Sequence, residues 1–354
     1  MTSRRIRWMF VAALLPVAVA APAFAQVDFT GLDMFWDVVL ILEQDADPED
    51  GLWNRLFATP GYAVLTKSEF SREFFIRLFS LAFKPSLEEE REEFLRSEKK
   101  WAVAHLEHIQ RAGERRTPIM EFRRSFVPES LVGRAAHIAA AWLSPAAIDG
   151  PPPVSFVVFG PDARGYIPVV IDVLLGMDLG ERLVELLAHE FHHYYRNRIL
   201  VYDREAVKDE DEDIVWVFDQ FQAEGMANLV TYRNLLEDDD PAGGLPEDFK
   251  KWFEKSPEIL RTLNDLLERA AESPEKQVEL GKELKSTVPR SGHPTGFYMA
   301  LTILDVLGKE DLIQATGDPL AFVLLYQKAA SGKENETPRF SQKALDVVTR
   351  VFDR

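Results

Sequence analysis

The segment at residues 188–196 carries two histidines and a glutamate at a spacing that would place all three on one side of a helix. It reads AHEFHHYYR, in which His189, Glu190 and His193 form the pattern HExxH. Apolar residues recur around it at helical spacing, so we expect a helix over residues 179–202. On that helix His189 and His193 would lie about 40° apart and one turn along the axis. Both imidazoles can then reach one ion, and the segment predicts a metal-binding helix.

The types of residue in this segment favour zinc. The chain has no cysteine, so a metal must be held by histidine or carboxylate side chains. Zn²⁺ takes nitrogen and oxygen ligands tetrahedrally, and a catalytic site leaves one position open for water. We therefore predict His189 and His193 as ligands and Glu190 as the general base for a metal-activated water. His192 turns to another side of the helix, where we expect it to pack or to support a ligand.

A third ligand is expected on a second helix, predicted over residues 214–237. Glu224 lies in the sequence QAEGMANL, in which Gly225 and Ala227 are small enough to let two helices approach closely. Asn228 follows Glu224 by one turn, where its side chain could hydrogen-bond a ligating imidazole and orient it. We predict that His189, His193 and Glu224 together hold Zn²⁺, although a glutamate on a helix is also commonly just an exposed acid.

The two motifs, HEFHH at residues 189–193 and EGMAN at residues 224–228, resemble those of the gluzincin metallopeptidases, the thermolysin-type clan. In that group the downstream Glu is often followed four residues later by an acid, where this chain has Asn228. Residues 56–62 and 292–308 also resemble bacterial proteins of unknown function described as zinc-dependent peptidases. The resemblance implies a zinc metallopeptidase that acts on peptide or protein substrates.

The same resemblance implies a sheet before the HExxH helix, with an edge strand that pairs with extended substrate. Residues 166–176 stand in the right place for that strand, and an ordinary core strand is an equally good interpretation. The segment at residues 291–300 offers further candidates. Peptide hydrolysis forms an oxyanion that a tyrosine hydroxyl or a histidine can stabilise, and His293 and Tyr298 flank a predicted helix start. We predict both as catalytic residues, with packing roles left open as alternatives.

The rest of the chain reads mostly as helix. The β-branched, apolar segments at residues 154–160 and 166–176 predict two strands in a hairpin or a small sheet. We predict an α+β, mainly α fold with this sheet beside the HExxH helix and the Glu-bearing helix. We expect helical regions at residues 26–147 and 246–354 to wall a cleft over a zinc-binding core at residues 148–237. They could also form one continuous domain.

The N-terminus predicts export. Arg4, Arg5 and Arg7 precede an apolar run, and Ala23-Phe24-Ala25 forms a small-x-small cleavage site. We expect a signal peptide over residues 1–25, cleavage after Ala25 and a periplasmic or secreted mature chain. An uncleaved anchor is the alternative. The formal net charge of −17 argues against nucleic acid as a partner and against anionic membrane surfaces. We expect no stable membrane insertion of the mature chain, and the sequence does not indicate an oligomeric state.

Other classes of protein share parts of this pattern. Glu190 and His193 also match half of a di-iron carboxylate site, but no other histidine has a glutamate three positions before it. A non-catalytic exported helical binding protein, or a degenerate peptidase, is the remaining alternative. Glu190 argues against it, because a structural zinc site needs no general base.

Overall fold

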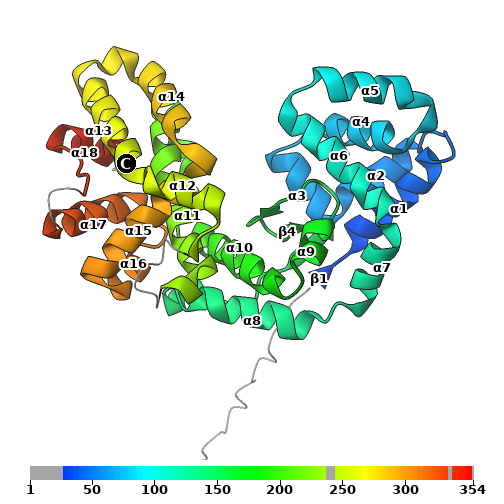
Figure 1. The fold of residues 1–354 in the computed structure, drawn as a ribbon, viewed down its shortest axis with the longest axis horizontal. Coiled ribbons are helices and arrows are strands. Elements are labelled where there is room, and N and C mark those ends of the chain that lie inside the picture. Colours follow the sequence, from blue (N-terminus) through cyan, green and yellow to red (C-terminus); the bar gives the residue numbers. More distant parts are fainter. Residues whose placement is uncertain (1–26, 237–243, 334–336, 353–354) are drawn as a thin grey trace, which may run out of the picture.

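The computed structural model describes residues 27–236, 244–333 and 337–352. Within them the chain is mainly helical, with one four-stranded sheet (Figure 1). The predicted α+β, mainly α class is confirmed. The predicted signal peptide lies outside the described residues. No helix in the described part of the chain is both long and apolar enough to cross a bilayer.

Phenylalanine-rich helices make up the N-terminal part of the chain. They are α1 (Thr30–Leu42), α2 (Asp50–Ala58), α3 (Pro60–Ser68), α4 (Arg72–Phe83), α5 (Glu88–Ser97), α6 (Lys100–Glu114) and α7 (Arg116–Ser125). Ser71 caps α4, because its hydroxyl accepts a hydrogen bond from the Phe74 N–H at 3.1 Å. The fully buried ring of Phe79 packs edge-on against that of Phe35, at 5.1 Å between centroids. Aromatic packing of this kind builds a first hydrophobic core.

The sheet has the strand order β1-β2-β4-β3, from β1 (Val27–Asp28), β2 (Val154–Val157), β3 (Ala163–Arg164) and β4 (Val169–Asp172). Strands β2 and β4 run parallel, with Val154 opposite Val169 and Val157 opposite Asp172. The small sheet is therefore as predicted, but its two main strands do not form a hairpin. The chain between them forms the short antiparallel edge strand β3 instead.

Asp172 ends β4 earlier than the apolar run in the sequence suggested. Its carboxylate accepts hydrogen bonds from the N–H groups of Leu174 and Leu175, at 2.9 and 3.0 Å, and so caps helix α9 (Val173–Leu179). The same carboxylate accepts from the Phe159 N–H at 3.1 Å and lies 2.8 Å from Nε2 of the buried His108. Residues 173–176, which we predicted as strand, are therefore helical.

The remaining helices follow the order of the chain. They are α8 (Pro128–Ala140), α10 (Leu183–Arg198), α11 (Glu212–Thr231), α12 (Glu247–Glu254), α13 (Ser256–Glu272), α14 (Gln277–Thr287), α15 (His293–Leu307), α16 (Lys309–Gln314), α17 (Pro319–Gly332) and α18 (Gln342–Phe352). Figure 1 shows α1 to α7 on one side of the sheet and α10 to α18 on the other, with α8 running beneath both. Helix α8, which we had placed in the N-terminal region, packs against α10.

Two hydrophobic cores meet at the sheet. Because side chains alternate along a strand, Val170 packs into the N-terminal core while Val169 and Ile171 pack into the core of α8 and α10 to α18. All four residues of β4 are buried, which is typical of a strand covered on both faces. The sheet thereby joins the two sets of helices.

Candidate metal centre

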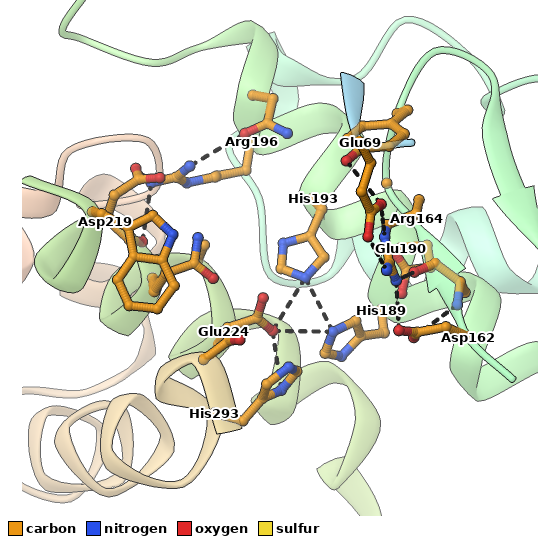
Figure 2. A pocket seen from close by; sticks show the side chains of 18 of the residues that line it. Glu69, Asp162, Arg164, His189, Glu190, His193, Arg196, Asp219, Glu224 and His293 are labelled. Carbon is orange, nitrogen blue, oxygen red and sulfur yellow. Dashed lines mark hydrogen bonds and ion pairs between the residues drawn. The ribbon is translucent and has the colours of Figure 1, made fainter. Parts of the chain in front are cut away.

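Helices α10 and α11 lie side by side and run in opposite directions. His189 on α10 lies near the end of α11, at Thr231, whereas Arg196 lies near its start, at Asp219. The predicted ligands sit where the two helices face each other at mid-length. The Nε2 atoms of His189 and His193 lie 3.4 and 3.3 Å from Oε2 of Glu224, and 3.0 Å from each other (Figure 2). The structure therefore brings the three predicted ligands together.

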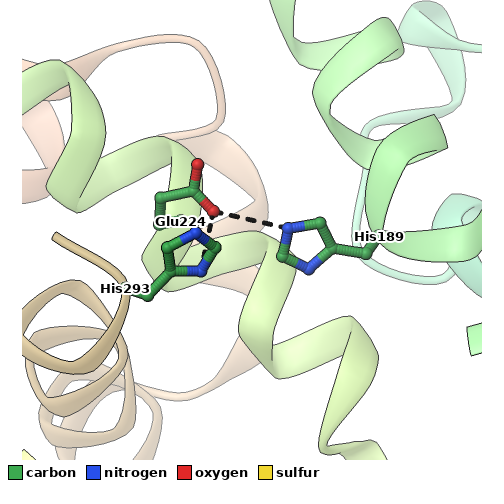
Figure 3. A group of neighbouring side chains, drawn as sticks. All are labelled: His189, Glu224 and His293. Atoms are coloured by element: carbon green, nitrogen blue, oxygen red, sulfur yellow. Dashed lines mark ion pairs between the residues drawn. The ribbon is translucent and has the colours of Figure 1, made fainter. Parts of the chain in front are cut away.

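His293 joins this group from a third helix. Its Nδ1 atom lies 3.1 Å from Oε2 of Glu224, and its ring stacks on that of His189 with the centroids 5.7 Å apart (Figure 3). His189, Glu224 and His293 offer ligand atoms that all lie within 4.8 Å of one another. The histidine predicted as a catalytic residue is thus placed directly against the predicted ligands.

Two glycines explain how α15 comes so close to α11. A Cβ atom added to Gly225 would overlap the Gly296 carbonyl, and one added to Gly296 would overlap the carbonyl of Phe221. The sequence indicated a close helix approach at Gly225, and the partner proves to be α15. This contact sets the first residue of α15, His293, beside Glu224.

The Glu224 carboxylate and the imidazoles around it are suited to binding a cation. Oε2 of Glu224 is buried, and no hydrogen bond of good geometry reaches it from the described residues, although three ring nitrogens surround it at 3.1 to 3.4 Å. Buried polar atoms are nearly always hydrogen-bonded. Nitrogen and oxygen atoms that converge on one point without such bonds are therefore well placed to bind a shared ion. Imidazole nitrogen and carboxylate oxygen are ligands that zinc accepts.

Thr231 fixes the orientation of His189, and the sequence analysis did not identify it. Its hydroxyl donates to the Ala227 carbonyl at 3.2 Å, so its oxygen is free to accept a hydrogen bond from Nδ1 of His189 at 2.9 Å. That bond places the ring proton on Nδ1 and leaves the Nε2 lone pair facing the cluster. Thr231 lies two helical turns after Glu224, which is the only sequence signal that could have indicated it.

Asn228 supports a different histidine from the ones we expected. Its Nδ2 atom lies 3.2 Å from Nδ1 of His293 and donates to the His293 carbonyl at 3.3 Å. Asn228 therefore ties α11 to the start of α15. Its contact is with His293 and not with His189 or His193.

Charge and burial oppose each other in this cluster. Burial raises the pKa of the Glu190 carboxyl above its usual value, although His189 and His193 favour its charged form. Burial would also raise the pKa of Glu224, but the surrounding imidazoles of His193, His293 and His189 hold that pKa well below its usual value. Burial lowers the pKa of His293 to about 4, against the attraction of Glu224. The site thus pairs a charged carboxylate, Glu224, with a more basic one, Glu190.

Two pockets open on opposite sides of the cluster and share Asp162, His189, Glu190 and His293. The first, which we call the polar pocket, has a volume of about 510 Å³ and is lined by the carboxyl-terminal half of α10, the start of α11 and residues 162–166. The second, which we call the leucine pocket, has a volume of about 340 Å³ and is lined by α9, the start of α10 and the end of α11. Together they form a cleft that runs along α10 and α11 past the predicted ligands.

The edge strand beside the cleft is β3, not the segment at residues 166–176. Strand β4 lies inside the sheet, between β2 and β3. Arg164 on β3 is held by Glu69, just after α3, through two contacts of 2.7 Å each, and both residues line the polar pocket (Figure 2). The loop after β3 also presses on the HExxH helix, because a Cβ atom on Gly165 would overlap the Cβ atom of His193.

Tyr298 lies away from the cluster, and the predicted catalytic position is corrected here. Its ring packs edge-on against Phe253 at 5.7 Å, and it lines neither the polar nor the leucine pocket. The reason is helical geometry, because five residues along a helix turn the side chain by roughly 140° from that of His293. His192 is fully buried and lines neither pocket, which suits a packing role.

Comparison with known proteins gives a family but no individual relative. No curated protein and no solved structure matches the chain. One family of sequences matches it over residues 53–335, a region that includes the whole cluster from His189 to His293. The chain therefore belongs to the family described as putative zinc dependent peptidase (DUF5700).

Proposed function

We propose that this protein is a zinc metallopeptidase in which His189, His193 and Glu224 hold Zn²⁺ and Glu190 is the general base. One observation carries the proposal. The Nε2 atoms of both HExxH histidines face the same carboxylate oxygen of Glu224, at 3.4 and 3.3 Å, and all three residues line the polar pocket. The family description supports hydrolysis of peptide bonds, and a peptide or protein is then the substrate.

Zn²⁺, when bound, would lower the pKa of a water molecule and polarise the peptide carbonyl. Glu190 accepts the proton of the attacking water and passes it to the leaving amine. Its raised pKa suits this task, because a base works best when its pKa approaches the working pH. His293 is neutral at ordinary pH and can donate a ring N–H to the developing oxyanion. The edge strand β3 offers backbone groups for an extended substrate.

We also propose that the protein acts outside the cytoplasm, in the periplasm or after secretion. The support is the basic, then apolar N-terminal sequence that ends in Ala23-Phe24-Ala25. Mass spectrometry of the protein from its native host should give a mature chain that begins at Gln26. A chain that retains residues 1–25 would refute cleavage.

The test of the catalytic proposal is the substitution Glu190→Gln. We expect the variant to keep its zinc and to lose peptide hydrolysis by a factor of about 10² to 10⁴, the usual contribution of a general base. Glu181→Gln is the matched control, because Glu181 is an exposed glutamate just before α10 and should leave the rate unchanged. Normal hydrolysis by zinc-loaded Glu190→Gln would refute the assignment.

A further inference from the structure

The leucine pocket combines apolar walls with positive charge. Leu175 and Leu179 of α9 and Leu186 of α10 line it, together with Tyr232 and Phe249. Two arginines, Arg182 before α10 and Arg290 before α15, line it as well. A volume of about 340 Å³ lies near the lower end of the range for small-molecule pockets, so it suits one amino-acid residue better than an extended peptide.

The arginines of the leucine pocket are not neutralised as the others in the cleft are. In the polar pocket, Arg164 is held by Glu69 at 2.7 Å, and the buried Arg196 is paired with Asp219. Arg182 is exposed and makes no hydrogen bond or ion pair with the described residues. Among the described residues, the Arg290 guanidinium reaches only the carboxylate of Asp248, at 3.4 Å, and that carboxylate is 87% exposed. The leucine pocket therefore has guanidinium groups available for a ligand.

Of the acids that line this pocket, Glu190 is the proposed general base, and the other two have partners. Glu185 faces Arg233 at 3.9 Å, and Asp162, which lines both pockets, is 2.6 Å from Arg164. Arg182 and Arg290 both act on the Tyr232 hydroxyl. Burial raises the pKa of Tyr232, and the positive charges of both arginines oppose this rise. The balance of charge at the pocket thus favours an anion.

The backbone at Arg290 is held in an unusual conformation. Arg290 and Ser291 have φ angles of 48° and 50°, in the left-handed region that non-glycine residues seldom adopt. Such residues cluster at ligand-binding sites, where surrounding contacts hold them in place. Here the conformation sets Arg290 at the leucine pocket and Ser291 at the polar pocket, on either side of His293.

We propose, resting on the peptidase function above, that the leucine pocket receives the C-terminal residue of the substrate. Its apolar side chain packs against the leucines and Phe249, and its carboxylate accepts hydrogen bonds from Arg182 and Arg290. The scissile bond is then the last peptide bond of the chain. Water supplies a hydroxyl to the carbonyl carbon, the C–N bond breaks, and the amine nitrogen gains a proton. The products are a shortened peptide and one apolar amino acid, so the enzyme is a carboxypeptidase.

The first test compares N-acylated peptides that end in leucine or phenylalanine, each as the free acid and as the amide. We expect kcat/KM for the acid to exceed that for the amide by about tenfold or more, the range of charge-assisted hydrogen bonds. Arg182→Gln and Arg182→Gln/Arg290→Gln should progressively remove this preference and keep the zinc. Arg269→Gln, an exposed arginine on α13 paired with Glu283 at 3.6 Å, is the control and should retain it. Equal rates for acid and amide in the wild type would overturn the proposal.

A second test separates the pocket from catalysis. Binding of N-acetylphenylalanine and of its amide is measured by calorimetry on full-length, zinc-loaded Glu190→Gln. We expect tighter binding of the acid, by about tenfold, and loss of the difference when Arg182→Gln is added. Selective binding by the variant, together with no peptide hydrolysis by the zinc-loaded wild type, would contradict the peptidase function and support the pocket. Hydrolysis of peptides without selective binding would contradict the pocket and leave the peptidase function standing.

Discussion

Three histidines surround one oxygen of Glu224, and their exposure distinguishes them. The side chains of His189 and His193 are 10% and 13% exposed, whereas that of His293 is 35% exposed. A buried imidazole oriented by Thr231 suits a ligand, and a more exposed one suits contact with substrate. We therefore propose that His189, His193 and Glu224 hold the ion and that His293 contacts the oxyanion.

The variant His293→Ala tests this division of roles. We expect it to retain zinc and to lower kcat by about 10² to 10³, as does the removal of one oxyanion donor in other hydrolases. Tyr298→Phe, on the same helix but outside both pockets, should leave kcat unchanged. Zinc content by plasma emission and steady-state kinetics check both variants. Loss of zinc from His293→Ala would make His293 a ligand and contradict the assignment.

Helices α11 and α15 meet where neither tolerates a side chain, so their contact can be tested with single methyl groups. We expect Gly296→Ala to reduce the free energy of unfolding by about 1–3 kcal/mol through overpacking and to lower activity by displacing His293. In Gly133→Ala on α8 the new Cβ atom has no neighbour within 4 Å, so this control should be neutral or more stable by up to about 1 kcal/mol. Urea unfolding checks both. Equal stability of the two variants would refute the close packing.

Helices α10 and α11 are also joined by a buried ion pair between Arg196 and Asp219, which Arg204 extends at 3.1 Å. Burial alone would raise the pKa of Asp219, but the two guanidinium charges hold it below its usual value. Because the folded-state pKa is depressed, the stabilisation is present above the unfolded-state pKa and is lost as pH falls through the folded-state pKa.

Asp219→Asn should therefore destabilise the protein most at neutral pH. Leaving Arg196 buried without its counter-charge is expected to cost about 3–5 kcal/mol. The gap in the free energy of unfolding between wild type and variant should stay constant from about pH 7 to pH 5. It should narrow below about pH 4. Urea unfolding across this range measures it. A gap that widens on acidification would contradict the pairing.

At the scale of the whole molecule, the two helices that carry the proposed ligands could be predicted because their signals are local. The HExxH spacing and the helical periodicity place His189 and His193, and the small residues after Glu224 indicate a helix contact. The parallel arrangement of β2 and β4 could not be predicted in the same way. The pairing of Val154 with Val169 depends on two cores that cover opposite faces of β4.

The rest of the site depends on contacts between segments far apart in the sequence. His293 reaches Glu224 only because α15 docks on α11, which no periodicity encodes. Arg182 and Glu69 carry no motif, and they become recognisable only when the cleft brings them to the two pockets. Tyr298 was predicted at the site because it lies close to His293 in sequence, and the turn of the helix moves it away.

The proposed metal centre is tested by measuring the zinc content of the purified chain and of its Glu224→Ala variant. We expect about one zinc per wild-type chain, loss of zinc in Glu224→Ala, and a lower melting temperature wherever zinc is absent. Glu212→Ala, an exposed glutamate at the start of the same helix, should keep its zinc. Full zinc occupancy in Glu224→Ala, with unchanged melting, would contradict a metal centre shared between α10 and α11.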